Sequence, residues 1–211
     1  MFRGKTMKTT LLIHYLPRKE RSNTKRLVDT FRRQVKGVFE EVDLTEDIPD
    51  MFVRENLMAY FRRDYVGKEL TSKEKKLLSK MDRFATQILK ADYIVLAYPM
   101  FNFSVPAIVK AYLDSIALKG KTWDEDEEGI YGNLHDKKVM ILTTSGGTYT
   151  DTDDKIVEYS TTLATTIFGF LGVEDIESVK AEGMYFYPEK KEIIMKQAFG
   201  KINLITKRWY E

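Results

Sequence analysis

The sequence predicts an α/β fold, a doubly wound, five-stranded parallel sheet with helices on both of its faces. Two patterns support this prediction. Short runs of apolar and β-branched residues recur along the chain, at 10–16, 37–44, 92–99, 138–145 and 176–183. Segments with apolar residues at helical spacing stand between these runs. Strands that alternate with helices pair in parallel, because each helix returns the chain to the same edge of the sheet.

The first half of the chain supplies three strands and two helical patterns. The run TLLIHYL is followed by a helix with the apolar stripe Leu27, Val28, Phe31 and Val35. A second helix precedes the third strand and has the stripe Leu77, Met81, Phe84 and Ile88. The third strand contains YIVLAY, which is continuously apolar, as expected of a strand that is buried on both faces.

The second half continues the alternation. The third strand is followed by a helix with Ile108, Tyr112 and Ile116 on one face. The fourth strand contains VMIL and is followed by a helix with the stripe Ile156, Tyr159, Leu163, Ile167 and Phe170. After the fifth strand, the last helix is predicted to run from about Pro188, in its first turn, to Trp209.

Composition limits the classes to which the protein can belong. We expect one domain over 9–211, with residues 1–8 as an N-terminal extension. Lys and Arg number 34 against 32 Asp and Glu, a balance that does not indicate nucleic acid binding. There is no Cys, and His14 and His135 are far apart in sequence, so disulfides, thiolate chemistry and metal ligation are not expected. No segment approaches the roughly 20 apolar residues of a membrane span, and a cytoplasmic protein without membrane partners is expected.

The first strand leads into a predicted anion site. Ser22, Asn23 and Thr24 stand where the next helix begins. Helix N-termini carry unpaired N–H groups and partial positive charge, and basic Arg18 and Arg21 lie nearby. This pattern favours a phosphate. The alternative is that Ser22 serves only as the N-cap of the helix.

The third strand leads into an aromatic loop. Pro99 ends the strand, and Met100, Phe101, Asn102 and Phe103 follow it. Ligands of doubly wound sheets bind beyond the carboxyl ends of the strands, where an apolar wall and one amide suit a flat heteroaromatic ring. The alternative is that these rings belong to the core. Ser104 is expected to cap the next helix, and Pro106 to lie in its first turn.

The fourth strand leads into the glycine pair Gly146 and Gly147, preceded by Thr144 and Ser145. Glycines permit positive φ and a close approach of the backbone to a ligand, and consecutive N–H groups can bind negative charge. A plain tight loop would also explain the pair. The next helix is expected to begin at the acidic residues Asp151, Asp153 and Asp154, which suit its dipole.

The three loops together favour a flavin mononucleotide. The chain has no G-x-G-x-x-G motif after its first strand and no phosphate-binding P-loop. A phosphate loop of Ser, Asn and Thr, combined with two loops that bracket a ring, is typical of FMN in a flavodoxin-like sheet.

Four stretches of the sequence resemble the FMN-dependent NADH azoreductases, within the wider flavodoxin-like quinone reductases. They are PMFNFSVPAIVKAYLDSIALKGKTW (99–123), TTSGGTYTD (143–151), RSNTKRL (21–27) and FLGVEDIESVKAEG (170–183). The resemblance implies that Ser22, Asn23 and Thr24 hold the phosphate and ribityl end of FMN. It also implies that the loop from Pro99 to Phe103 lines the flavin, and that the loop from Thr144 to Gly147 bounds its pyrimidine side.

Three residues depart from the family pattern. Leu16 stands where relatives usually have a serine that touches the phosphate, so Arg18 or backbone groups would have to replace that contact. Ser145 stands in place of a frequent arginine, and Tyr149 in place of a frequent histidine. These departures leave the substrate preference open. Tyr149 is a possible general acid, and no residue is assigned as catalytic.

The resemblance implies an activity and a partner. NADH or NADPH would reduce the flavin, and a small aromatic acceptor, either a quinone or an azo compound, would then take two electrons at the same site. Relatives are homodimers with sites at the subunit interface, so the stretch 51–66 is expected to be a helix at that interface. Trp123 and the loop 123–138 are candidates to cap the ring. Two alternatives are a flavodoxin-type electron-transfer protein and a flavin-free regulatory module.

Overall fold

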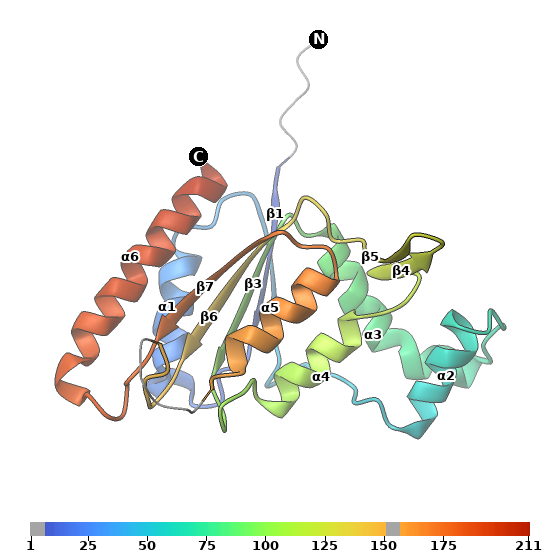
Figure 1. The fold of residues 1–211 in the computed structure, drawn as a ribbon, viewed down its shortest axis with the longest axis horizontal. Coiled ribbons are helices and arrows are strands. Elements are labelled where there is room, and N and C mark those ends of the chain that lie inside the picture. Colours follow the sequence, from blue (N-terminus) through green and yellow to red (C-terminus); the bar gives the residue numbers. More distant parts are fainter. Residues whose placement is uncertain (1–6, 151–156) are drawn as a thin grey trace, which may run out of the picture.

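The computed structural model describes residues 7–150 and 157–211. Its main sheet is parallel and has the strand order β2-β1-β3-β6-β7 (Figure 1). The strands are β1 (Thr9–His14), β2 (Val38–Asp43), β3 (Tyr93–Pro99), β6 (Lys138–Thr144) and β7 (Asp175–Ala181). Each agrees with a predicted run to within two residues at either end. The doubly wound fold is therefore confirmed, and its strand order reverses between β1 and β3.

Helices cover both faces of this sheet, as predicted. On one face lie α1 (Asn23–Arg32) and α6 (Lys191–Tyr210), the latter preceded by a 3-10 turn at Pro188–Lys190. The other face is covered by α3 (Ser72–Lys90), α4 (Ala107–Ile116) and α5 (Ser160–Phe170) (Figure 1). The strands alternate between the two cores, because successive side chains of a strand point to opposite faces. On β1, Leu11 and Ile13 enter the α3–α4–α5 core, and Leu12 enters the α1–α6 core.

The stretch between β2 and α3 forms the additional helix α2 (Arg54–Asp64). It packs on α3 through a small apolar cluster to which Ala59, Tyr60 and Leu78 belong. The helical prediction for 51–66 is therefore confirmed over α2.

The segment predicted as a loop over 123–138 instead contains an antiparallel hairpin, β4 (Trp123–Asp126) and β5 (Gly129–Gly132). Gly132 lies against the backbone of Leu171 and Gly172, just before β7 begins, and Trp123 packs on Phe170 with ring centroids 5.3 Å apart. These neighbours place the hairpin toward the amino ends of the strands (Figure 1). Within one chain, Trp123 is therefore remote from the loops that it was expected to cap.

The predicted stripe of α5 was also wrong in part. Tyr159 and Phe170 are exposed, and the buried positions of the helix include Ala164 and Phe168. The buried positions also include the polar residues Ser160 and Thr161, so the spacing of the large apolar residues did not mark the buried face. Ile156 and the expected helix start at 151–154 lie outside the described residues, and the observed helix begins at Ser160. The predicted stripe of α3 was also wrong at one position. It included Leu77, but the neighbouring Leu78 is the more deeply buried of the two.

No helix within residues 7–150 and 157–211 is long and apolar enough to cross a membrane.

Candidate functional site

The loops that follow β1, β3 and β6, which we call the β1, β3 and β6 exits, converge at the carboxyl edge of the sheet. Thr144, the last residue of β6, makes hydrogen bonds to the other two exits. Its hydroxyl is 2.7 Å from the hydroxyl of Thr24 at the start of α1. Its carbonyl accepts a 2.9 Å hydrogen bond from the backbone N–H of Met100. The β1 exit is tied to β3 directly, because Tyr15 N donates to Ala97 O at 2.9 Å. The structure therefore brings together the three loops that the sequence singled out.

The β1 exit ends in a capped helix. Ser22 is the N-cap of α1, with its hydroxyl accepting a 3.2 Å hydrogen bond from Lys25 N, so this side chain has the predicted capping role. Among the described residues, the backbone N–H groups of Asn23 and Thr24 have no acceptor. These two donors and the positive end of the helix remain suited to an anion.

Leu16 does not face this anion site. Its side chain is buried in the α1–α6 core, and its carbonyl accepts a 3.0 Å hydrogen bond from Lys19 N at the start of a 3-10 turn. Arg18, Lys19 and Arg21 are exposed around this turn. Leu16 therefore contributes packing, and the positive charge near the β1 exit comes from exposed basic side chains.

The β3 exit is a tight reverse turn. Phe101 and Ser104 exchange two backbone hydrogen bonds of 3.0 Å, and the central residues Asn102 and Phe103 have φ of 46° and 67°. Asn tolerates this left-handed region, whereas for Phe it is strained by roughly 1–2 kcal/mol. Backbone strain of this kind is concentrated at functional sites. The backbone role of Ser104 also corrects its predicted role, since Pro106, and not Ser104, is the N-cap of α4.

The turn holds its aromatic rings in solvent. Phe101 is 44% exposed and Phe103 is 45% exposed, Asn102 is exposed, and Pro99 and Met100 are half-buried. The core alternative is therefore wrong for the two phenylalanines. Each phenylalanine packs against another ring. Tyr15 contacts Phe101 edge-on and Tyr149 contacts Phe103 edge-on, with ring centroids 6.1 Å apart in each pair.

The glycines of the β6 exit are needed for close packing, and not for positive φ as predicted, because neither has a φ in that region. A Cβ on Gly147 would lie 3.0 Å from Tyr149 Oη and 3.3 Å from Phe186 Cε2. A Cβ on Gly146 would lie 3.3 Å from the Cβ of Tyr185. The glycines thus admit the aromatic side chains that surround them.

The hydroxyls of this loop are already used within the chain. The hydroxyl of Ser145 donates to Gly147 O at 2.8 Å, and that of Thr144 pairs with Thr24. Within the described part of the chain, the backbone N–H groups of Gly146 and Gly147 have no acceptor. The groups that the β6 exit offers to a ligand are therefore backbone donors.

A fourth loop, from Gly183 to Tyr187 after β7, completes this edge, and sequence reasoning did not identify it. Tyr185 is 79% exposed and Phe186 is 66% exposed, directly beside the glycine pair. The signal was present in MYFYP, three aromatic residues between the end of the fifth strand and Pro188. This repeats the pattern of aromatic residues after a buried strand that marked the β3 exit.

One buried hydroxyl behind the site has a structural role. Tyr98, the residue before Pro99 on β3, donates a 3.0 Å hydrogen bond to Ser160 O at the start of α5. Burial raises the pKa of this phenol far above its usual value, so Tyr98 stays neutral. It anchors α5 beneath the β3 exit and supplies no charge to the site.

These residues fit FMN in three respects. The start of α1 offers two free N–H groups to a phosphate, the β6 exit offers two more to a ring that carries negative charge, and the β3 exit exposes two aromatic rings. The described residues contain no group of three or more His, Asp or Glu side chains that could hold a metal ion. The arrangement is that of a site for a planar, phosphorylated ligand.

Comparisons with known proteins agree with this fold. A family model described as a flavodoxin-like fold matches residues 8–204. The FMN-dependent NADH:quinone oxidoreductase 1 of Bacillus subtilis (strain 168) is 30% identical over 169 residues, which cover 76% of this chain and 81% of the relative.

Two solved structures are similar over nearly the whole chain. The azoreductase from Bacillus anthracis str. Sterne has a TM-score of 0.87 and 24% identity, covering 96% of this chain and 100% of its own. The FMN-dependent NADH-azoreductase from Bacillus anthracis str. Ames Ancestor, solved in complex with FMN, has a TM-score of 0.85 and 27% identity. That match covers 97% of this chain and 100% of the other.

Proposed function

The chain belongs to the flavodoxin-like family that includes the FMN-dependent NADH:quinone oxidoreductases and azoreductases, and from this premise we propose that it is such an oxidoreductase itself. It would bind FMN and transfer two electrons from NADH or NADPH to a quinone or an aromatic azo compound. The observation that best supports the proposal is a set of four backbone N–H groups and two exposed rings at one edge of the sheet, at and beside the point where strand order reverses. Within residues 7–150 and 157–211, these four N–H groups have no acceptor.

Each exit has a defined task in this proposal. The N–H groups of Asn23 and Thr24 bind the phosphate, while Ser22 fixes the start of the helix as its cap. The turn from Pro99 to Phe103 supplies the wall of the ring site, with the Asn102 amide at its exposed tip. The backbone from Thr144 to Gly147 closes the opposite side.

Bound FMN would supply the redox chemistry, accepting a hydride from the nicotinamide and passing two electrons to the acceptor. The chain's own contribution is orientation and charge stabilisation. Negative charge on the pyrimidine side would be stabilised by Gly146 N–H and Gly147 N–H, and losing one such donor costs about 3 kcal/mol in comparable sites. Tyr149 stands between the two loops, with its hydroxyl beside Gly147 and its ring on Phe103, where it can donate a proton to the acceptor.

We also propose that the active form is a homodimer. The stretch around α2 exposes a row of large apolar side chains to solvent, namely Met51, Val53, Met58, Phe61, Tyr65 and Val66. Exposed apolar patches of this kind mark interfaces, and this one covers the helix that the resemblance places between subunits. Sedimentation equilibrium tests the proposal. A monomer at micromolar concentration would contradict it.

The first experiment on function is the visible absorbance spectrum of the purified protein, followed by anaerobic addition of NADH and then of a quinone. We expect a yellow, two-banded spectrum that bleaches with NADH and returns with the quinone. If neither NADH nor, in a second trial, NADPH bleaches the bound flavin, the protein is an electron carrier fed by another reductase. If the protein is colourless and does not take up added FMN, the flavin-free alternative is correct.

A further inference from the structure

The loop after β7 exposes two aromatic rings that the proposed binding of FMN does not use. Tyr185 and Phe186 pack against each other with ring centroids 5.7 Å apart and an interplanar angle of 65°. Both are mostly exposed, although burial of an aromatic ring is a large source of stability. Two neighbouring rings left in solvent at the edge of a ligand site indicate that something other than the core binds them.

Backbone hydrogen bonds fix the position of these rings relative to the β6 exit. Tyr185 N and Phe186 N both donate to Gly146 O, at 3.1 and 3.2 Å. Gly183 N donates to Gly147 O at 2.8 Å, and Met184 N donates to Ser145 O at 3.0 Å. Because four backbone bonds join the two loops, the backbone that carries the two rings is held beside the glycine pair.

The same contacts connect the rings to the proposed ring site. Gly147 lies between Phe186 and Tyr149, since a Cβ on this glycine would touch both side chains. Tyr149 in turn packs edge-on against Phe103 of the β3 exit. An aromatic row therefore runs from the β3 exit to the β7 exit, and Tyr185 and Phe186 form its outer end.

We propose that Tyr185 and Phe186, which we name the aromatic ledge, determine specificity by binding the outer rings of electron acceptors with several fused or linked aromatic rings. This inference rests on the proposed function. An acceptor with one ring is accommodated at the inner part of the row. A larger planar acceptor extends outward, and its second or third ring stacks on the ledge. Among the acceptors of the proposed enzyme, the ledge thus favours those with several rings over those with one.

The test is the binding of two oxidised acceptors to the FMN-loaded protein, measured by calorimetry in the absence of NADH. Anthraquinone sulfonate is the three-ring probe, and duroquinone is the one-ring probe. We expect Phe186→Ala and Tyr185→Ala each to raise the Kd of anthraquinone sulfonate by roughly two- to tenfold, the range measured for single aromatic pairs, and to leave the Kd of duroquinone unchanged. Phe186→Tyr, which keeps a ring, should bind like the wild type.

Phe39→Ala is the matched control, because Phe39 is a partly exposed ring on the edge strand β2, remote from the carboxyl-edge loops. It should leave both Kd values unchanged. Equal Kd values for anthraquinone sulfonate in the wild type and both ledge variants would overturn the inference. An equal increase in Kd for both probes would also overturn it, since the ledge would then not distinguish acceptors by size.

Two further measurements separate this inference from its premise. Flavin content and the limiting rate of flavin reduction by NADH should be the same in wild type and ledge variants. If the wild type itself binds no FMN, or its flavin is not reduced, the proposed function is wrong, and the inference about the ledge is wrong with it. If the ledge variants change from dimer to monomer in sedimentation, the two rings belong to a contact with a second copy, and the inference is overturned.

Discussion

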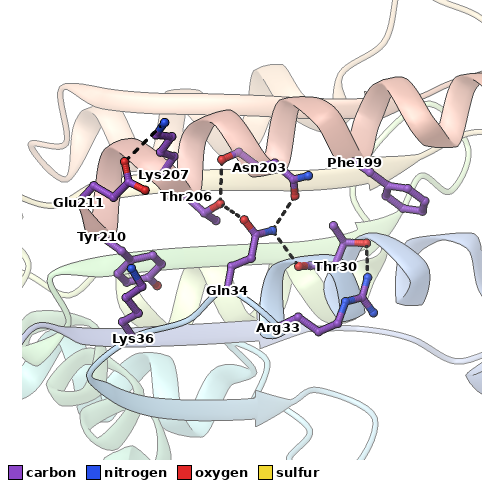
Figure 2. Close-up of a pocket in the computed structure, with 10 residues that line it drawn as sticks. All are labelled: Thr30, Arg33, Gln34, Lys36, Phe199, Asn203, Thr206, Lys207, Tyr210 and Glu211. Carbon is purple, nitrogen blue, oxygen red and sulfur yellow. Dashed lines mark hydrogen bonds and ion pairs between the residues drawn. The ribbon is translucent and has the colours of Figure 1, made fainter.

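Two regions of the molecule gather polar groups at a surface, and they differ in whether those groups already have partners. Between α1 and the second half of α6 lies a hollow of about 660 Å³ (Figure 2). The amide of Gln34 occupies its centre, donating to Asn203 Oδ1 at 2.7 Å and to Thr30 O at 3.0 Å, and accepting from the Thr206 hydroxyl at 2.6 Å. At the carboxyl edge of the sheet, in contrast, four backbone N–H groups have no acceptor among the described residues.

The difference shows why volume alone does not identify a ligand site. The side-chain amide of Gln34 is engaged on both its oxygen and its nitrogen, so the α1–α6 hollow acts as a polar link between two helices. The carboxyl edge presents free donors and exposed rings, features that stabilise the fold little without a ligand. We therefore place function at the carboxyl edge and stability at the α1–α6 hollow, and the predictions that follow test this division.

The largest effect is expected from Gly147→Val. The added side chain would collide with Tyr149 and Phe186 and displace the loop that offers backbone donors, which should weaken FMN binding by about 1–3 kcal/mol, or roughly 5- to 150-fold. Gly147 lies in a loop outside the helices and strands, so the protein should still fold. Equilibrium titration with FMN measures the affinity, and circular dichroism checks the fold. Unchanged affinity in the folded variant would show that this loop does not bind the ring.

A smaller effect is expected from Asn102→Leu. The substitution removes the amide, and it places leucine, which poorly tolerates positive φ, at a position whose φ is 46°. FMN affinity should therefore fall about tenfold. Asn102→Gly is the control, because it keeps the turn but also lacks the amide. If the Gly variant binds as weakly as the Leu variant, the amide itself contacts the cofactor. Wild-type affinity in both variants would contradict any role of Asn102 in binding.

The complementary test at the α1–α6 hollow is Gln34→Leu. It removes the hydrogen bonds to Asn203, which is exposed, and to Thr206, whose hydroxyl still donates to Ile202 O at 2.8 Å. The free energy of unfolding should therefore fall by about 0.5–1.5 kcal/mol, the net contribution of an ordinary hydrogen bond. FMN affinity should not change, because the residue belongs to the paired region. Urea denaturation and FMN titration on the same sample measure the two quantities. A loss of FMN affinity without a loss of stability would reverse our assignment of the two regions.

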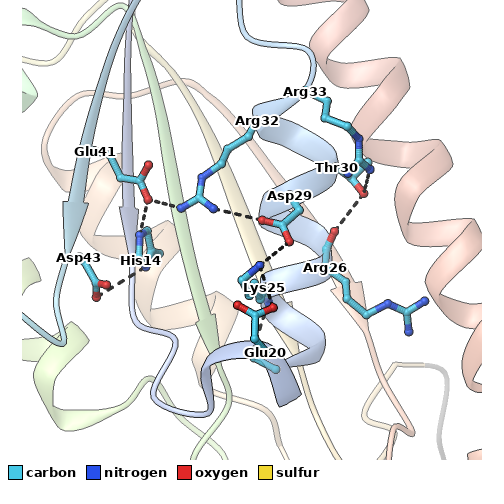
Figure 3. A network of polar contacts seen from close by, with 11 residues as sticks. His14, Glu20, Lys25, Arg26, Asp29, Thr30, Arg32, Arg33, Glu41 and Asp43 are labelled. Carbon is cyan, nitrogen blue, oxygen red and sulfur yellow. Dashed lines mark hydrogen bonds and ion pairs between the residues drawn. The ribbon is translucent and has the colours of Figure 1, made fainter.

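The smallest effect concerns the charged network between β1, β2 and α1 (Figure 3). A 2.6 Å hydrogen bond from His14 Nε2, together with an ion pair to Arg32, holds the pKa of Glu41 below its usual value. A carboxyl with a lowered folded pKa stabilises the protein above its unfolded pKa of about 4.3, and this stabilisation disappears as the pH falls through the folded pKa.

Glu41→Gln should therefore lower the free energy of unfolding near pH 7 by no more than about 1 kcal/mol, as for other partly exposed ion pairs. As the pH falls below about 4.3, the wild type should progressively lose this advantage, and the two proteins should become equally stable once the pH is below the lowered folded pKa of Glu41. Urea denaturation from about pH 7 to about pH 3 measures both curves. A difference that persists unchanged at the acidic end would show that Glu41 acts through packing and not through charge.

The amino-acid sequence was sufficient to predict the order of strands and helices and the positions of three loops at the carboxyl edge of the sheet. These features are encoded in local patterns. Each signal, whether a strand or helix period, a helix cap or the residues just after a strand, spans only a few positions. The resemblance to FMN-dependent azoreductases rested on the same local stretches, 21–27, 99–123 and 143–151, and the family comparison bears it out.

How the loops meet depends on the tertiary structure. Tyr185 and Phe186, about 40 residues further along the chain, pack closely against the glycine pair, and no local pattern encodes a contact over that separation. The same holds for the burial of Leu16, for the placement of Trp123 at the far end of the sheet and for the face of α5 that enters the core. Each depends on which residues distant in sequence become neighbours once the sheet has formed, a property of the whole fold and not of any segment.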